Sequence, residues 1–263
     1  MYTDLKEQAW RANMEIPARN LAIYTWGNVS ALDPDKAVFA IKPSGVPYDR
    51  LKAEDIVIVD LDGKVADGKL NPSSDTPTHA QLYRYFLQTH SAIRGITHTH
   101  SPYATSWAQA CRSIPLLGTT HADHGFRPVP CTPYLSEKAV QTAYEKETGL
   151  LIIETLKNPS IACPVALPHK LHGCTGKGAC FDEALNPAEC QMILLGGHGP
   201  FTWGTDAEKS VYNAAVLEEI AKMAWVCMTV NPDFAPLPDY VIQKHYDRKH
   251  GKNAYYGQAS KTR

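Results

Sequence analysis

Residues 93–102 read IRGITHTHSP, and the interpretation of the whole chain starts from this stretch. Its apolar first half is typical of a buried strand, and Ser101-Pro102 is typical of the start of a helix. Side chains two positions apart on a strand point to the same face, so His98 and His100 are expected side by side. Two neighbouring imidazoles form a pair of metal ligands that needs only one or two more to complete a site.

Two residues elsewhere in the chain could complete such a site. Asp75 lies just before the expected start of a helix, and His198 lies in a glycine-flanked turn after the apolar run 192–195. A plainer interpretation of His198, as a turn histidine packed on Trp203, stays open. Three imidazoles and one carboxylate suit Zn²⁺ and would also accept Mn²⁺ or Co²⁺. The predicted metal ligands are therefore Asp75, His98, His100 and His198.

The spacing of apolar residues predicts strands interleaved with helices. Strands are expected at 21–25, 38–41, 56–60, 93–96 and 192–195, and helices at 4–16, after Thr76, Ser101, Ser136 and Thr205, and before Gly251. This order is typical of an α/β or mixed α+β fold, and no glycine-rich dinucleotide or Walker fingerprint is present. Residues 159–190 are rich in Pro, Gly and Cys without a clear period. We interpret them as a loop inserted into a single domain over residues 1–263.

Three polar turns fall near the ends of expected strands. They are Gly27-Asn28, Ser44-Gly45 and Ser73-Ser74. Small hydroxyls, amides and glycine N–H groups that converge can cradle a phosphate, and Lys42 could add charge. Ordinary turn chemistry is the better explanation of each turn taken alone. Three such turns in the first third of the chain favour, modestly, an anion site.

Composition limits the partners and the location. The chain has 263 residues, 44% of them hydrophobic, and a formal net charge of −1. A charge near zero gives no field that would attract nucleic acid or an anionic membrane. The first ten residues lack the apolar core of a signal peptide, and no apolar run is long enough to cross a bilayer. Seven cysteines without the regular spacing of a secreted scaffold favour a reduced setting, so we expect a cytoplasmic protein.

Two polar segments near the middle and the end of the chain have no assigned role from spacing alone. Asp123, in the polar run 119–124, could be a general base or equally a solvated turn residue. Tyr255-Tyr256 follows a basic helix end in the C-terminal segment. Terminal segments are normally polar, so this pair indicates a tail that docks, for example on another subunit.

The order of several motifs extends this interpretation. They are TWGNVS (25–30), IKPSGV (41–46), PSSDTPTH (72–79), HTHS (98–101), GTTHAD (118–123), HGPF (198–201), and KHG with AYYGQ (249–258). Together they resemble the L-ribulose-5-phosphate 4-epimerase branch of the class II aldolase/epimerase family over nearly the whole chain. The resemblance implies a central β-sheet covered by helices on both sides. It also implies a homotetramer with active sites between subunits and a small sugar phosphate as substrate.

The resemblance also assigns roles. Asp75, His98, His100 and His198 match metal ligands, and Gly27, Asn28, Ser44, Gly45, Ser73 and Ser74 match substrate and phosphate contacts. Asp123 and Tyr256 match an acid/base pair, with Tyr256 reaching in from a neighbouring subunit. Related aldolases carry a glutamate in place of Asp75 as their base. The shorter aspartate favours the epimerase branch, in which this position holds metal.

The implied activity interconverts L-ribulose 5-phosphate and D-xylulose 5-phosphate by metal-assisted retro-aldol and aldol steps, in arabinose or ascorbate-type breakdown. One alternative is a class II aldolase of the fuculose- or rhamnulose-phosphate type. Another is a non-catalytic, adducin-like binding module. A second metal site in the insert, formed by His169, His172, Cys174 and Cys180, is a further alternative, although its spacing is not that of a zinc finger.

Overall fold

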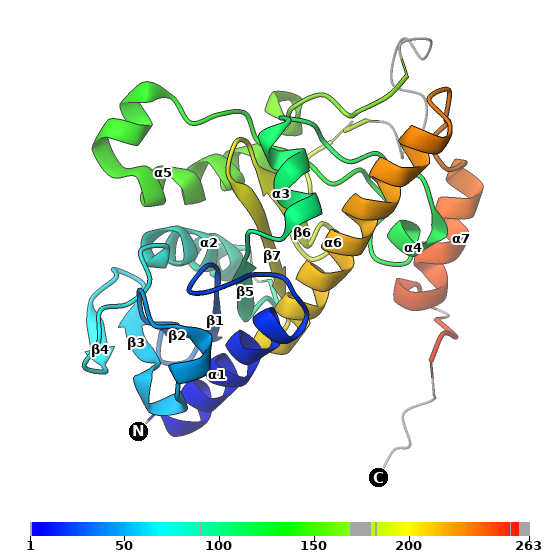
Figure 1. Ribbon diagram of the computed structural model, residues 1–263. Coiled ribbons are helices and arrows are strands. Elements are labelled where there is room, and N and C mark those ends of the chain that lie inside the picture. Colours follow the sequence, from blue (N-terminus) through cyan, green and yellow to red (C-terminus); the bar gives the residue numbers. More distant parts are fainter. Residues whose placement is uncertain (1, 90, 169–179, 182, 253, 258–263) are drawn as a thin grey trace.

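A single seven-stranded sheet lies at the centre of the computed structural model, which describes residues 2–89, 91–168, 180–181, 183–252 and 254–257 (Figure 1). The strands are β1 (Asn28–Asp33), β2 (Val38–Ile41), β3 (Val57–Asp60), β4 (Val65–Asp67), β5 (Gly95–His98), β6 (Met192–Leu195) and β7 (Gly199–Gly204). Their order is β4-β3-β2-β1-β5-β7-β6, and each pair of neighbours is antiparallel.

Seven α-helices accompany this sheet in the described part of the chain. They are α1 (Thr3–Ala18), α2 (Thr76–Gln88), α3 (Pro102–Gln109), α4 (Thr119–Ala122), α5 (Glu137–Lys157), α6 (Ala207–Val230) and α7 (Asp239–His250). Short 3-10 helices occur at Tyr48–Arg50, Ala53–Asp55 and Pro159–Ile161. Among the described residues, none of these helices combines the length and the apolar character that a membrane crossing requires.

One face of the sheet packs on α2 and α5. Alternate strand positions such as Phe39 and Ile96 form a buried cluster with Tyr83 and Phe86 of α2 and Leu156 of α5. Successive side chains of a strand point to opposite faces, so the positions between them are available to the other side of the sheet.

The opposite face packs on α1, α6 and α3. Ala31 of β1 and Ile58 of β3 lie in one cluster with Ile16 of α1 and Val211 of α6. Further along the sheet, α3 and the second half of α6 cover β6, with Leu194 in that cluster. The predicted fold class, a central sheet covered by helices on both sides, is confirmed.

The expected strand at 21–25 is wrong. Residues 21–27 form turns and bends without strand pairing, and β1 begins at Asn28, three residues after the end of the expected strand. Tyr24 and Gly27 have φ values of +55° and +75°, and this left-handed conformation interrupts an extended chain. β1 lies between β2 and β5 and pairs with both, so tertiary pairing rather than residue preference makes the strand.

The predicted helix starts are confirmed to within one residue, since the N-caps of α2 and α6 are Asp75 and Asp206 rather than Thr76 and Thr205. α3 begins after Ser101, and the hydroxyl of Ser136 accepts a hydrogen bond from the backbone N–H of Ala139 at the start of α5. The carboxylate of Asp206 accepts a hydrogen bond from the backbone N–H of Lys209 and begins α6 in the same way.

The described part of the predicted insert at 159–190 contains one 3-10 turn, Pro159–Ile161, and no longer helix or strand. Residues 169–179 and 182, which include His169, His172 and Cys174, lie outside the described residues, and so does the second metal site suggested there.

Candidate active site

Three histidines meet at one end of the central strands. His98 is the last residue of β5, His100 follows it, and His198 lies in the turn between β6 and β7. The ligand nitrogens of the three rings all lie within 4.8 Å of one another, and Nε2 of His98 is 3.1 Å from Nε2 of His198. His98 stands opposite Asn28 of β1 and Phe201 of β7, so the register of the sheet fixes its position.

The protonation of these rings suits a metal. Nδ1–H of His98 donates to the carbonyl oxygen of Pro200 at 2.9 Å, which leaves the lone pair of Nε2 directed at the cluster. Burial lowers the pKa of His98 to about 3 and also lowers the pKa of His100 and His198. All three rings are therefore neutral at neutral pH. Convergent lone pairs on neutral imidazoles are a donor set for a divalent cation, so these residues fit such a metal.

Asp75 faces the same cavity from the start of α2 but does not belong to the 4.8 Å histidine cluster. Its carboxylate accepts a hydrogen bond from Nδ2 of Asn28 at 2.6 Å. Burial raises the pKa of Asp75, but the opposing effects of His98, His79 and the Asn28 amide bring it below its ordinary value. The site thus adds an ionised carboxylate to three neutral imidazoles, which favours a bound cation.

The three polar turns noted in the sequence meet beside the histidines. The backbone N–H of Ser73 donates to the carbonyl oxygen of Lys42, and that of Ser44 donates to the carbonyl oxygen of Asn71, both at 3.0 Å. A cavity of about 370 Å³ results. Its walls are Thr25, Trp26, Gly27, Asn28, Lys42, Pro43, Ser44, Gly45, Ser73, Ser74, Asp75, His98, His100 and His198. All ten residues predicted as metal ligands or substrate contacts are in this set.

The turn at Gly27 holds the first wall of the cavity against the end of β5. A Cβ atom on Gly27 would lie 2.8 Å from the carbonyl oxygen of His98, and the φ of +75° also favours glycine. The hydroxyl of Tyr48 donates to the carbonyl oxygens of Trp26 and Gly27, at 2.8 and 3.0 Å. The neighbouring Asn28 therefore has a fixed position, and its buried Oδ1 has no hydrogen-bond partner among the described residues.

Lys42, which the sequence identified only as added charge, is a further candidate for a functional residue of this cavity. Its side chain is 2% exposed, and its Nζ lies 3.4 Å from the carbonyl oxygen of Thr25 and 4.9 Å from the ring centre of Tyr48. In the described part of the chain no carboxylate pairs with it, and burial lowers its pKa to about 8. Because a buried unpaired cation is costly, an anion in this cavity would be strongly favoured.

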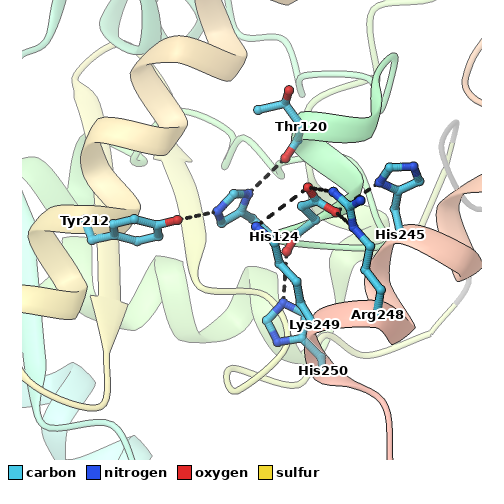
Figure 2. Close-up of polar contacts among 8 residues, drawn as sticks. Thr120, His124, Tyr212, His245, Arg248, Lys249 and His250 are labelled. Carbon is cyan, nitrogen blue, oxygen red and sulfur yellow. Dashed lines mark hydrogen bonds and ion pairs between the residues drawn. The ribbon is translucent and has the colours of Figure 1, made fainter. Parts of the chain in front are cut away.

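Asp123 and Tyr256 do not line this cavity. Asp123 lies at the end of α4, where its carboxylate contacts Nδ1 of His245 at 3.0 Å, Nε of Arg248 at 2.8 Å and Nζ of Lys249 at 3.6 Å. Figure 2 shows these α7 side chains gathered around one point. The ring centre of Tyr256 lies 5.0 Å from the Arg248 guanidinium and 4.5 Å from Nζ of Lys249. Asp123 and Tyr256 of one chain therefore belong to a common cluster, which we call the α7 cluster.

The α7 cluster keeps Asp123 ionised. Burial raises the pKa of its carboxyl group, but the hydrogen bonds from Arg248 and His245 and the charge of Lys249 outweigh this effect and lower it. Nε2 of His250 also donates to the backbone carbonyl oxygen of Asp123 at 3.0 Å and ties the end of α7 to α4.

Comparison with known proteins assigns the class. Residues 7–225 match the family described as "Class II Aldolase and Adducin N-terminal domain", and the chain belongs to this family. Proteins named L-ribulose-5-phosphate 4-epimerase UlaF from Salmonella paratyphi A and Salmonella paratyphi C are 46% and 47% identical to it over 254 residues. Each of these alignments covers 97% of this chain and 98% of the relative.

Solved structures support the same fold. An L-fuculose 1-phosphate aldolase superimposes with a TM-score of 0.68 at 21% identity, covering 93% of this chain and 95% of its own. An L-fuculose-1-phosphate aldolase from Thermus thermophilus gives a TM-score of 0.57 at 22% identity, covering 87% of this chain and 97% of its own. At this level of identity the likeness concerns the fold alone.

Proposed function

We propose that this protein is an L-ribulose-5-phosphate 4-epimerase, an isomerase that interconverts L-ribulose 5-phosphate and D-xylulose 5-phosphate. The observation that carries the proposal is the cavity in which three neutral histidines face three polar turns and the buried Lys42. One side of this cavity suits a divalent cation and the other suits a phosphate. The names of relatives that match along almost their whole length support the choice of substrate.

The metal is proposed to be Zn²⁺, held by His98, His100 and His198 with Asp75 beside them; Mn²⁺ or Co²⁺ would suit the same donors. A divalent cation held there would supply Lewis acidity. The proposed inversion at C4 breaks and re-forms the C3–C4 bond, because the hydrogen on C4 is not acidified by the C2 carbonyl.

The polar turns have a distinct task in this reaction. After the C3–C4 bond breaks, the fragment that carries the phosphate has to stay in place while the aldehyde turns its other face. The ammonium group of Lys42 and the hydroxyl groups of Ser44 and Ser73 would hold the phosphate through charge-assisted hydrogen bonds. Retention of the phosphate-bearing fragment allows the C3–C4 bond to re-form. The reaction is then an epimerisation rather than a net cleavage.

The acid/base pair is proposed to be Asp123 and Tyr256. Both belong to the α7 cluster, and neither lines the cavity of its own chain. We therefore propose that a neighbouring copy supplies both residues together, in a homotetramer whose active sites lie between subunits. We also propose that residues 1–263 form one domain and that the enzyme works in the cytoplasm.

The two alternatives are not favoured. The two L-fuculose 1-phosphate aldolases compared above are 21% and 22% identical to the chain, whereas the relatives named as epimerases are 46–47% identical. An adducin-like module without activity would not need a histidine cluster and a buried lysine in one cavity.

Product analysis tests the proposal. Purified protein is incubated with L-ribulose 5-phosphate, with and without a chelator, and the products are separated. Chelator-sensitive formation of D-xylulose 5-phosphate is expected. Accumulation of free glycolaldehyde would instead identify an aldolase, and no turnover by metal-replete protein would contradict both enzymatic assignments.

A further inference from the structure

His198 has a hydrogen-bond partner that the sequence did not indicate. The hydroxyl of Tyr144 lies 2.9 Å from Nδ1 of His198, on the side of the ring away from His98. The two ring centres are 6.3 Å apart with an angle of 25° between their planes. The hydroxyl of Tyr144 therefore contacts Nδ1 of His198 in the same way that the carbonyl oxygen of Pro200 contacts Nδ1 of His98.

Tyr144 reaches this position because α5 is kinked. Ala143 has φ −159° and ψ 63°, so the helix is interrupted one residue before Tyr144. The following turn is fixed on α2, since the hydroxyl of Thr78 donates to the carbonyl oxygen of Glu145 at 2.6 Å. One turn later Gly149 allows the close approach of the two helices, because a Cβ there would lie 2.8 Å from Cβ of Gln81.

The same helix α2 begins directly after Asp75. The contacts between α2 and α5 therefore help to place Tyr144 relative to Asp75 and the histidine cluster. A side chain that merely filled the space between α5 and the turn would not need a hydroxyl aimed at a ring nitrogen.

The direction of this hydrogen bond follows from the chemistry of the ring. A histidine that binds a cation through Nε2 carries its proton on Nδ1, and this N–H needs an acceptor. The hydroxyl oxygen of Tyr144 is placed to accept it. With that acceptor present, the tautomer of His198 that offers Nε2 to the centre is favoured, and rotation of the ring is restricted.

We propose that Tyr144 is a positioning residue that selects the Nδ1–H tautomer of His198, holds its ring toward His98 and thereby increases the affinity of the centre for a divalent cation. This inference rests on the proposed function in one respect, namely that the histidine cluster holds a metal. Partners of this kind typically change metal affinity by about 10- to 100-fold.

The test compares Tyr144→Phe with Tyr212→Phe. Phenylalanine keeps the ring and removes only the hydroxyl in each case. Tyr212 is a matched control, because its hydroxyl also bonds a histidine, His124 at 2.8 Å, and this pair lies outside the cavity (Figure 2). The dissociation constant for Zn²⁺ is measured by competition with a chromophoric chelator, and the visible absorption of the Co²⁺-loaded protein reports the ligand geometry.

Tyr144→Phe is expected to weaken Zn²⁺ binding by at least about 10-fold and to alter the Co²⁺ spectrum, while Tyr212→Phe changes neither. The thermal midpoints of the metal-free proteins separate this effect from a loss of folding, and equal midpoints are expected for Tyr144→Phe and the wild type. An unchanged dissociation constant for Tyr144→Phe, or equal weakening in both variants, would overturn the inference. A wild-type protein that binds no divalent cation would instead contradict the proposed function itself.

Discussion

Replacement of Lys42 by methionine is expected to make the protein more stable and a poorer enzyme. The Lys42 side chain is 2% exposed, and its ammonium group has no carboxylate partner among the described residues. Methionine has a similar length and is readily buried. The substitution therefore removes a desolvated charge without leaving a large cavity.

The magnitude follows from the pKa of Lys42, which burial lowers from 10.5 to about 8. A difference of about 2.5 in pKa corresponds to about 3 kcal/mol at about 1.36 kcal/mol each. The unfolded chain binds this proton more readily than the folded one, so the penalty to the folded state is complete below pH 8 and fades as the pH rises through 10.5. At pH 7 the Lys42→Met variant should exceed the wild type by about 3 kcal/mol in free energy of unfolding, and at pH 10 by only about 1 kcal/mol.

Urea unfolding of the metal-free, ligand-free proteins at pH 7 and pH 10 measures both values. Lys64→Met, at an exposed position in the turn after β3, is the control and should change neither. In the metal-loaded proteins the KM of Lys42→Met for L-ribulose 5-phosphate should rise by about 10- to 100-fold, since a charge-assisted hydrogen bond to phosphate is lost. A variant that is less stable than the wild type at pH 7, or a difference independent of pH, would refute the reasoning.

Three further predictions concern the metal centre, the assembly and the sheet. His100→Asn should lower the bound metal per subunit and reduce kcat by at least about 100-fold; a metal-replete, active variant would contradict the centre. Mixing His100→Asn subunits with Asp123→Asn subunits should restore up to about a quarter of the wild-type activity, as separate chains supply cavity and cluster. A mixture of Asp123→Asn with Tyr256→Phe should stay inactive, and recovery there would show that the pair comes from different chains. Gly95→Ala should lower the Tm by roughly 5–10 °C, because its Cβ would lie 2.1 Å from the carbonyl oxygen of Asp206; an unchanged Tm would contradict this packing.

The sequence could predict the candidate metal ligands because a local pattern marks each of them. The two-residue period of a strand sets His98 and His100 on one side, and a glycine-flanked turn after an apolar run marks His198. Helix-start signals placed Asp75 correctly at the beginning of α2. Each of these inferences needs only a few neighbouring residues. The approach of His198 to His98, 100 residues away, depends instead on the antiparallel pairing of β5 with β7, which no local pattern contains.

Other features depend on packing between distant segments, and local patterns do not contain them. The kink at Ala143 that brings Tyr144 to His198 depends on contacts between α5 and α2, and α5 shows no breaking residue at that point. The lowered pKa of Lys42 depends on burial beside Tyr48. β1 was missed for the same reason, since its strand character comes from pairing on both edges.

The charges of the α7 cluster suggest a physical reason for forming the active site from residues of two neighbouring subunits. Arg248 and Lys249 outweigh the single carboxylate of Asp123, so the cluster carries a net positive charge. A sugar phosphate held in the cavity of a neighbouring copy presents the opposite charge, and complementary potentials favour close approach of the two surfaces. In the proposed assembly the substrate would therefore strengthen the contact that delivers Asp123 and Tyr256. Within an isolated chain the same carboxylate stays paired with its own cations, and the cavity with its histidines and Lys42 has no acid or base from this pair.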